Sequence, residues 1–261
     1  SEMCIRDRIH TSNDSGVTWT PRDSVRQWHA VTSSADGSML VAADYGGHLY
    51  TSIDAGVTWT PRDSSRNWRA LASSADGNKL VAGADGDSIY TSADAGLTWI
   101  ARNSVRAWTS VASSADGRML VAGADAGQIY TSTNSGVTWM PRDDNRQWYG
   151  LASSADGKRL AATVWNGRIY TSVDAGVTWT PRESPNRWFF VASSADGSKL
   201  VAPLVGGPTG LIYTSVGDRT TLGTTGTLAG GQYDAIKLQY LGGGLYMPVE
   251  HHSYTGGFLF E

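Results

Sequence analysis

The sequence predicts an all-β fold, a β-propeller of four-stranded blades, from an internal repeat, its turn residues and its aromatic content. Tryptophans recur every 40 residues in two series, one starting at Trp19 and the other at Trp28. A repeat of about 40 residues that contains several short strands is typical of propeller blades. The 31 glycines and 11 tryptophans suit tight turns and large side chains between packed sheets. The i, i+3, i+4 spacing of helical repeats is not found.

Each repeat divides into four predicted strands, as the unit that begins at Trp68 illustrates. Strands are expected over 68–74, 79–83, 88–92 and 97–100, and a looser loop over 101–107 leads to the next unit. The strands are separated by turn segments rich in Asp and Gly, such as Ala75-Asp76-Gly77. Complete units begin at Trp28, Trp68, Trp108, Trp148 and Trp188.

The third turn of each unit carries the motif Ser-x-Asp-x-Gly-x-Thr-Trp, which we call the box turn. It resembles the Asp-box (BNR repeat) of sialidases and related propellers. Five copies are in register, with Asn replacing Asp in the fourth, and a sixth copy over 215–222 is degraded. The acidic or amide position is occupied by Asp14, Asp54, Asp94, Asn134 and Asp174.

The box turns are expected to stabilise turns rather than bind a ligand. An Asp at the start of a tight turn accepts hydrogen bonds from backbone N–H groups two residues further on, and Gly supplies the conformational freedom. Calcium binding is the functional alternative, but one carboxylate per turn supplies too few oxygens. We therefore predict no metal site. The resemblance implies that these turns lie on the face away from any ligand site.

Residues 1–8 fit none of the repeats and are predicted to be a leader, so that 9–261 form a single propeller. Five units start near residues 28, 68, 108, 148 and 188. A closing blade is expected from 233–261 together with 9–27, which would remove open sheet edges. We predict six blades, with seven as the alternative, because Gly257–Glu261 and Ile9–Ser12 compete for the same strand position.

A repeated arginine precedes the first-strand tryptophan of every unit, and a second series follows the box turn, beginning with Arg22. One interpretation is a cationic rim that binds carboxylates or sulfates. The other is ion pairing with nearby Asp23, Asp63, Asp143 and Glu183, together with stacking on tryptophan. The predicted rim arginines are Arg26, Arg66, Arg106, Arg146 and Arg187.

Positions that differ between units are better candidates for a specific site than positions that repeat. The residue after the first-strand tryptophan varies, as do the loops that join the second and third strands of each unit. Aromatic and polar side chains together suit sugar rings. The candidate ligand-binding residues are His29, Arg69, Tyr149, Phe189, Tyr45, His48, Asp85, Asp87, Trp165 and Arg168. Thr109 occupies the same position in the third unit.

The sialidase resemblance implies three arginines, a Tyr nucleophile paired with Glu, and an Asp acid. Tyr45 and Tyr149 are candidate nucleophiles, but no ordered arginine triad is found. A two-carboxylate glycosidase would draw on carboxylates in small Gly-rich turns, namely Asp44, Asp85, Asp87 or Asp125. We therefore predict no catalytic residues and no cofactor.

Composition narrows the classes of partner. The net charge of -3 gives no indication of nucleic acid binding, and no apolar run approaches the roughly 18 residues of a membrane span. The lone Cys4 excludes internal disulfides. We expect a monomer in an extracellular or periplasmic location, although the chain shows no signal peptide.

Taken together, these patterns predict a non-catalytic recognition propeller. Its ligand is expected to be a glycan or an anionic molecule or polymer, bound on the face opposite the box turns. Two alternatives stay open: a sialidase-like or other glycoside hydrolase, and a scaffold for protein assembly with another protein as partner.

Overall fold

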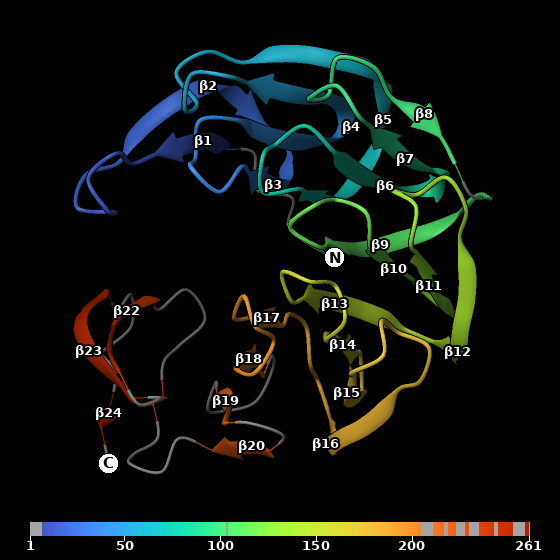
Figure 1. The fold of residues 1–261 in the computed structure, drawn as a ribbon. Coiled ribbons are helices and arrows are strands. Elements are labelled where there is room, and N and C mark those ends of the chain that lie inside the picture. Colours follow the sequence, from blue (N-terminus) through green and yellow to red (C-terminus); the bar gives the residue numbers. More distant parts are fainter. Residues whose placement is uncertain are drawn as a thin grey trace.

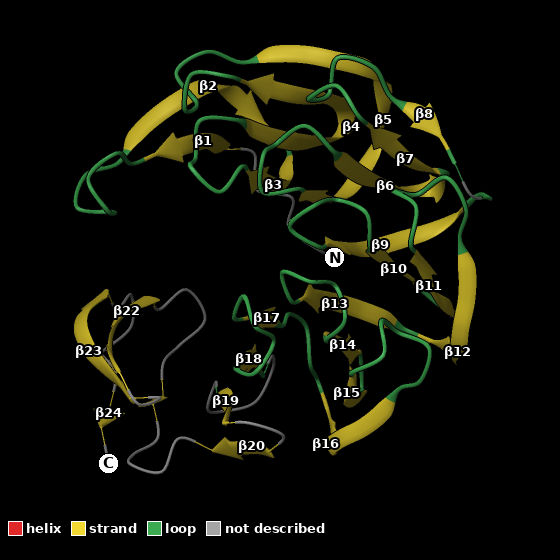
Figure 2. Ribbon diagram, viewed as in Figure 1, coloured by secondary structure: helices red, strands yellow, loops and turns green. Residues whose placement is uncertain are grey.

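The computed structural model describes residues 7–102, 104–204, 211–216, 219–222, 228–229, 235–242, 245–252 and 259–260. All regular structure in these ranges is β-strand (Figure 2), which confirms the all-β prediction. Within them no helix is long and apolar enough to cross a membrane. Most of the predicted leader and the enlarged loop over 205–210 lie outside the described residues.

The strands are short and follow one another closely along the chain. They are β1 (Asp7–Thr11), β2 (Thr20–Arg26), β3 (Trp28–Ser33), β4 (Leu40–Ser52), β5 (Thr60–Ser73), β6 (Leu80–Asp87), β7 (Ile89–Ser92), β8 (Ile100–Ala101), β9 (Arg106–Ser113), β10 (Leu120–Ala124), β11 (Gly127–Ser132), β12 (Met140–Arg146), β13 (Trp148–Ser153), β14 (Leu160–Val164), β15 (Gly167–Ser172), β16 (Thr180–Asn186), β17 (Ala192–Ser193), β18 (Leu200–Pro203), β19 (Ile212–Val216), β20 (Arg219–Leu222), β21 (Leu228–Ala229), β22 (Ala235–Gly242), β23 (Leu245–His252) and β24 (Leu259–Phe260).

The repeat units form antiparallel sheets that follow one another around a central axis (Figure 1). The fourth unit is the sheet β13-β14-β15-β16, and the fifth is β17-β18-β19-β20. The first three units are joined in one ten-stranded sheet, since the long strands β4 and β5 each serve as two successive strands. In each unit the first strand lies nearest the central axis and the fourth strand lies farthest from it (Figure 1).

The outermost strand begins later than the sequence predicted. The prediction placed it over 97–100, but β8 begins at Ile100, and β12 and β16 likewise begin directly after the box-turn tryptophan. The segment expected to be a loop is strand in β12 (Met140–Arg146). Side-chain hydrogen bonds hold the Gly-x-Thr-Trp segment in the turn, so ladder pairing starts only beyond it. Pro141 is tolerated there because an outermost strand pairs on one side only.

The first-strand tryptophans form the core between neighbouring sheets. Trp68, Trp108, Trp148 and Trp188 are at most 1% exposed. Each packs edge-on against the third-strand tyrosine of its own unit, with ring centroids 4.9–5.4 Å apart. In the fifth unit the partner is Tyr213, so the enlarged loop leaves this contact intact. Aromatic pairs of this geometry stabilise a core beyond the area that they bury.

A chain of backbone hydrogen bonds ties neighbouring units together near the axis. The N–H of the alanine in each first turn donates to the carbonyl of the equivalent alanine in the next unit, at 2.6–2.8 Å. Because the donors and acceptors are backbone groups at the same repeat position, the contact recurs in every described unit. The series runs through Ala35, Ala75, Ala115, Ala155 and Ala195.

The predicted closing blade is not assembled in the described strands. β1 pairs with β2, and β22 pairs with β23 as the expected hairpin, but no ladder joins the two pairs. The C-terminal segment that competed for a third-strand position contributes β24, which pairs with β21. The described sheets thus form an open arc.

Candidate functional site

The box turns are networks of local hydrogen bonds. In the second copy, Thr58 donates its N–H and its hydroxyl to the Asp54 carboxylate, at 2.9 and 2.6 Å. Ser52 donates to Asp54 at 2.7 Å and accepts from the N–H of Gly56, whose φ is +84°. The Nε1 of Trp59 donates to the Gly56 carbonyl. The backbone N–H that donates to the Asp54 carboxylate therefore belongs to the residue four positions later, whereas the sequence predicted a donor two positions later.

This network lowers the pKa of the box-turn carboxylates. The Thr58 hydroxyl, its N–H and the Ser52 hydroxyl lower the pKa of Asp54 to about 2. Asn134 makes the corresponding contacts with Thr138, accepting from its N–H and donating to its hydroxyl, both at 2.9 Å. An amide can replace the acid, which indicates a role in the turn. No group of three or more His, Cys, Asp or Glu side chains in the described part of the chain could hold a metal ion.

Four of the five predicted rim arginines contact the tyrosine of the unit that follows them in the chain. The guanidinium groups of Arg26, Arg66, Arg106 and Arg146 lie 4.3–4.8 Å from the ring centroid of the third-strand tyrosine. Arg187 is exposed and makes no ion pair with a described residue. Three ion pairs expected from the sequence are formed, namely Arg26–Asp23 (3.2 Å), Arg66–Asp63 (3.9 Å) and Arg146–Asp143 (3.5 Å). These contacts favour the structural interpretation of the series over a ligand-binding rim.

A cavity of about 580 Å³ lies between the innermost strands. The variable residue that follows the first-strand tryptophan lines it in all five units. The cavity also includes residues that the sequence reasoning missed, notably Phe190 and three aliphatic side chains. The variable residues are His29, Arg69, Thr109, Tyr149 and Phe189.

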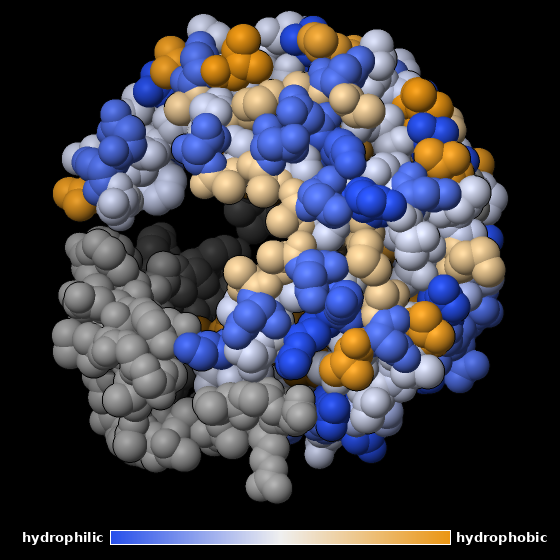
Figure 3. Space-filling model, viewed as in Figure 1, coloured by the Kyte–Doolittle hydropathy of each residue, from blue (hydrophilic) through white to orange (hydrophobic). Residues whose placement is uncertain are grey.

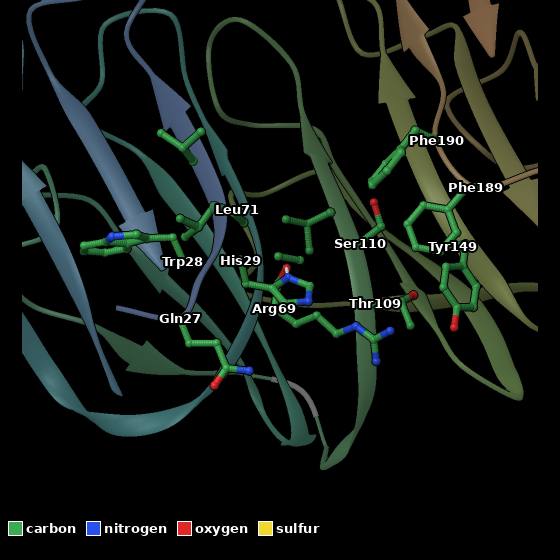
Figure 4. A pocket seen from close by; sticks show the side chains of 14 residues that line it. Gln27, Trp28, His29, Arg69, Leu71, Thr109, Ser110, Tyr149, Phe189 and Phe190 are labelled. Atoms are coloured by element: carbon green, nitrogen blue, oxygen red, sulfur yellow. Dashed lines mark hydrogen bonds between the residues drawn. The ribbon is translucent and has the colours of Figure 1, made fainter. Parts of the chain in front are cut away.

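Arg69 extends along the cavity wall toward Tyr149, passing Thr109 (Figure 4). Its guanidinium carbon lies 5.7 Å from the ring centroid of Tyr149, two units away. The small side chain of Thr109 leaves room for this approach, and its hydroxyl donates to the carbonyl of Trp148 at 2.5 Å. Arg69 is the one Arg or Lys among the described residues that line the cavity.

An aromatic wall forms the opposite side of the cavity. Phe189 lies 5.0 Å from Tyr149 and 4.5 Å from Phe190, measured between ring centroids. Trp165 packs against both Tyr149 and Phe189, with its ring centroid 5.5 Å from that of Tyr149 and 5.7 Å from that of Phe189. Phe190 lines the cavity and is 61% exposed.

The first residue of the variable loop lies beside the variable first-strand residue of the same unit. Tyr45 lies against His29, with ring centroids 5.7 Å apart. Asp85 forms an ion pair with Arg69 at 3.6 Å. Trp165 and Tyr149 make the aromatic contact described above. These six candidates are thus brought to one region as three adjacent pairs.

Three other candidates are not among the residues that line the cavity. Asp87 is held by Arg66 at 3.1 Å. His48 and Arg168 occupy the same repeat position, and each makes a hydrogen bond to the carbonyl of a residue with positive φ in the fourth strand. These contacts are His48 Nδ1 with Asp63 O (2.7 Å) and Arg168 Nη1 with Glu183 O (2.6 Å), and Gln128 Nε2 with Asp143 O (3.2 Å) repeats them. The position varies in residue type while keeping one structural role.

The outer surface carries scattered apolar residues. Figure 3 shows strongly apolar residues around the outer edge of the described surface, separated by polar ones. The exposed apolar residues of the chain include one from each box turn, at 53–74% exposure: Val17, Val57, Leu97, Val137 and Val177. Because they are separated, they do not form a single large apolar patch on the side in view.

Comparison with known proteins identifies the fold. An ancestral GH74 enzyme matches with a TM-score of 0.66 and 16% identity, over 84% of this chain and 35% of that chain. YCF48 bound to D1 peptide matches with a TM-score of 0.56 and 15% identity, over 82% and 71%. The beta-propeller domain of Cps50 (Swd1) from Myceliophteria thermophila matches with a TM-score of 0.56 and 14% identity, over 72% and 64%.

These structures are β-propellers, so the chain has the β-propeller fold. It spans only about a third of the GH74 enzyme that it matches. No protein-family model and no curated protein matches the sequence. At these identities the likeness establishes the fold and leaves the ligand open.

Proposed function

We propose that this chain is a non-catalytic recognition propeller that binds a glycan through the cavity between its innermost strands. One observation carries the proposal: the aromatic side chains of Tyr149, Phe189 and Phe190 converge with the guanidinium of Arg69 on a cavity of about 580 Å³. Its volume is within the range of about 300–1,000 Å³ typical of small-ligand sites.

The chemistry of this wall suits sugars. Aromatic faces pack against the C–H faces of a sugar ring, while fixed polar groups bond its hydroxyls. Arg69 and Thr109 are polar groups at the cavity, and Arg69 can also receive a carboxylate on an acidic sugar. Asp85 partly neutralises Arg69, which favours a neutral or singly charged glycan over a densely anionic polymer.

A glycan array identifies a bound glycan, and isothermal titration calorimetry then measures its affinity for the parent protein and for variants. The Trp165→Ala variant removes the ring packed behind Tyr149 and Phe189, and we expect it to weaken binding about tenfold. Trp19→Ala is the matched control, because Trp19 is a box-turn tryptophan that is 61% exposed and is not among the residues that line the cavity. Equal affinities for the two variants, or no bound glycan on the array, would rule the proposal out.

A hydrolase is the second candidate, suggested by the likeness to a GH74 enzyme. No Asp or Glu is among the described residues that line the cavity, and the nearby carboxylate of Asp85 is engaged by Arg69. Sustained release of reducing ends from a bound oligosaccharide, abolished by Asp85→Asn, would establish this candidate instead. An assembly scaffold, as suggested by YCF48 with its D1 peptide, would select a protein partner in a pull-down from the native source.

We further propose that the box turns place the chain among the Asp-box propellers. Their hydrogen bonds, repeated with the same geometry in copies one, two, three and five, support this. We also propose closure into six blades, with the hairpin β22–β23 completing the sheet of β1 and β2.

A further inference from the structure

We infer that the cavity is amphipathic, and that its ligand is a glycoside whose alkyl or aryl aglycone enters the apolar end while the sugar occupies the polar end. This inference rests on the proposed glycan-binding function and specifies its ligand class. It comes from how polar and apolar side chains are divided between the two ends of the cavity.

The polar end is formed by His29, Arg69, Thr109 and the hydroxyl of Tyr149. Figure 4 shows these side chains together on one side of the cavity. Arg69 is held there by Asp85, and Thr109 is fixed by its hydrogen bond to the next unit. The polar groups therefore have defined positions from which they can bond sugar hydroxyls.

The apolar end is formed by Val31, Leu71, Val111 and Phe190, with the small polar side chain of Ser110 beside Phe190. All four line the same cavity, and Figure 4 shows Leu71 and Phe190 on the side away from the Arg69 guanidinium. Val31, Leu71 and Val111 are the same repeat position in three successive units, two residues beyond the variable position. Alternate residues on a strand share a face. The side chains two residues beyond the variable position therefore face the cavity, as the variable side chains do.

Part of this apolar surface lies open to the cavity. Val31 is 65% exposed and Phe190 is 61% exposed, although both line a cavity between sheets. A free sugar presents hydroxyls on every edge and would leave these groups without an apolar partner. Burying an attached alkyl chain against them contributes about fourfold in affinity for each fully buried methylene.

Affinities of the full chain for methyl β-D-glucoside, hexyl β-D-glucoside and 1,2-hexanediol test the inference by calorimetry. We expect hexyl glucoside to bind about tenfold to a hundredfold more tightly than methyl glucoside, and hexanediol to bind weakly. Val31→Asn should reduce the affinity for hexyl glucoside several-fold and leave that for methyl glucoside unchanged. Val57→Asn is the matched control, because Val57 is an exposed box-turn valine outside the cavity.

The outcomes separate the two proposals. Equal affinities for methyl and hexyl glucoside would overturn the inference and leave glycan binding standing. Equal affinities for hexyl glucoside and hexanediol would show that the sugar contributes nothing, which overturns both. A loss of hexyl glucoside binding that is the same in Val31→Asn and Val57→Asn would also overturn the inference, as would no binding of any of the three compounds.

Discussion

The hydroxyl of Thr109 connects two units at the candidate site, and replacing it by a methyl group is a direct test of that connection. Thr109 is only 8% exposed, and its Oγ1 lies 2.5 Å from the carbonyl of Trp148 and 3.1 Å from that of Gly123. Thr109→Val keeps the shape of the side chain but removes the donor. The buried carbonyl of Trp148 then loses the hydrogen bond that it accepts from the Thr109 hydroxyl.

The expected loss follows from that geometry. A net hydrogen bond contributes about 1 kcal/mol, and a buried carbonyl left without its partner costs about 1–3 kcal/mol. Thr109→Val should therefore lower the free energy of unfolding by about 1–3 kcal/mol, which corresponds to a fall in Tm of about 2–10 °C for a chain of this size. Thr109→Ser keeps the donor and should remain within about 1 kcal/mol of the parent protein.

Urea denaturation followed by tryptophan fluorescence, together with thermal melting, measures the effect. Thr32→Val is the matched control, since Thr32 lies on β3 and its hydroxyl makes no hydrogen bond within the described part of the chain. If Thr109→Val and Thr32→Val changed the Tm equally, or if Thr109→Ser were as damaging as Thr109→Val, the reasoning would be refuted.

Three further predictions concern packing, pH and the ligand site. Gly123→Ala would place a Cβ 2.9 Å from the Cβ of Trp148, so we expect about 1–3 kcal/mol of destabilisation by urea titration; an unchanged midpoint would mean that the sheets have room to separate. The pKa of Asp54 is lowered from 3.8 to about 2 by its hydrogen bonds, so its contribution to stability is fully present above about pH 4 and disappears as the pH falls through 2. Asp54→Asn should therefore flatten the dependence of the urea midpoint on pH between 4 and 2, and an unaltered slope would contradict this. Asp85→Asn frees Arg69 from its ion pair at 3.6 Å and should raise the affinity for a uronic acid about threefold to tenfold in calorimetry, whereas weaker binding would show that Asp85 itself contacts the ligand.

The repeat made much of the architecture predictable. Equivalent positions of a repeat occupy equivalent places, so the variable position after the first-strand tryptophan was expected to gather at one site in every unit. The structure places His29, Arg69 and Tyr149 together at the cavity. The start of the outermost strand was predicted too early, because the strand propensity of the segment before Trp99 is overridden by the side-chain network of the box turn.

Loop candidates were less predictable than first-strand candidates. Asp85 and Asp87 are two residues apart in sequence, yet Asp85 pairs with Arg69 at the cavity and Asp87 pairs with Arg66 outside it. A register shift in the ladder between the two residues accompanies this separation. Irregular pairing of this kind depends on contacts with the next unit, which sequence alternation cannot specify.

The sequence by itself determined the all-β class, the strand order within a unit and the repeated turns, because each depends on short-range preferences that recur every 40 residues. Only the tertiary structure decided which variable residues meet. The approach of Arg69 to Tyr149, the exposure of Phe190 and the division of the cavity into two ends depend on the angle and distance between successive sheets. Those are set by buried tryptophans and blade-to-blade hydrogen bonds, contacts between residues about 40 positions apart whose geometry exists only once the sheets have packed.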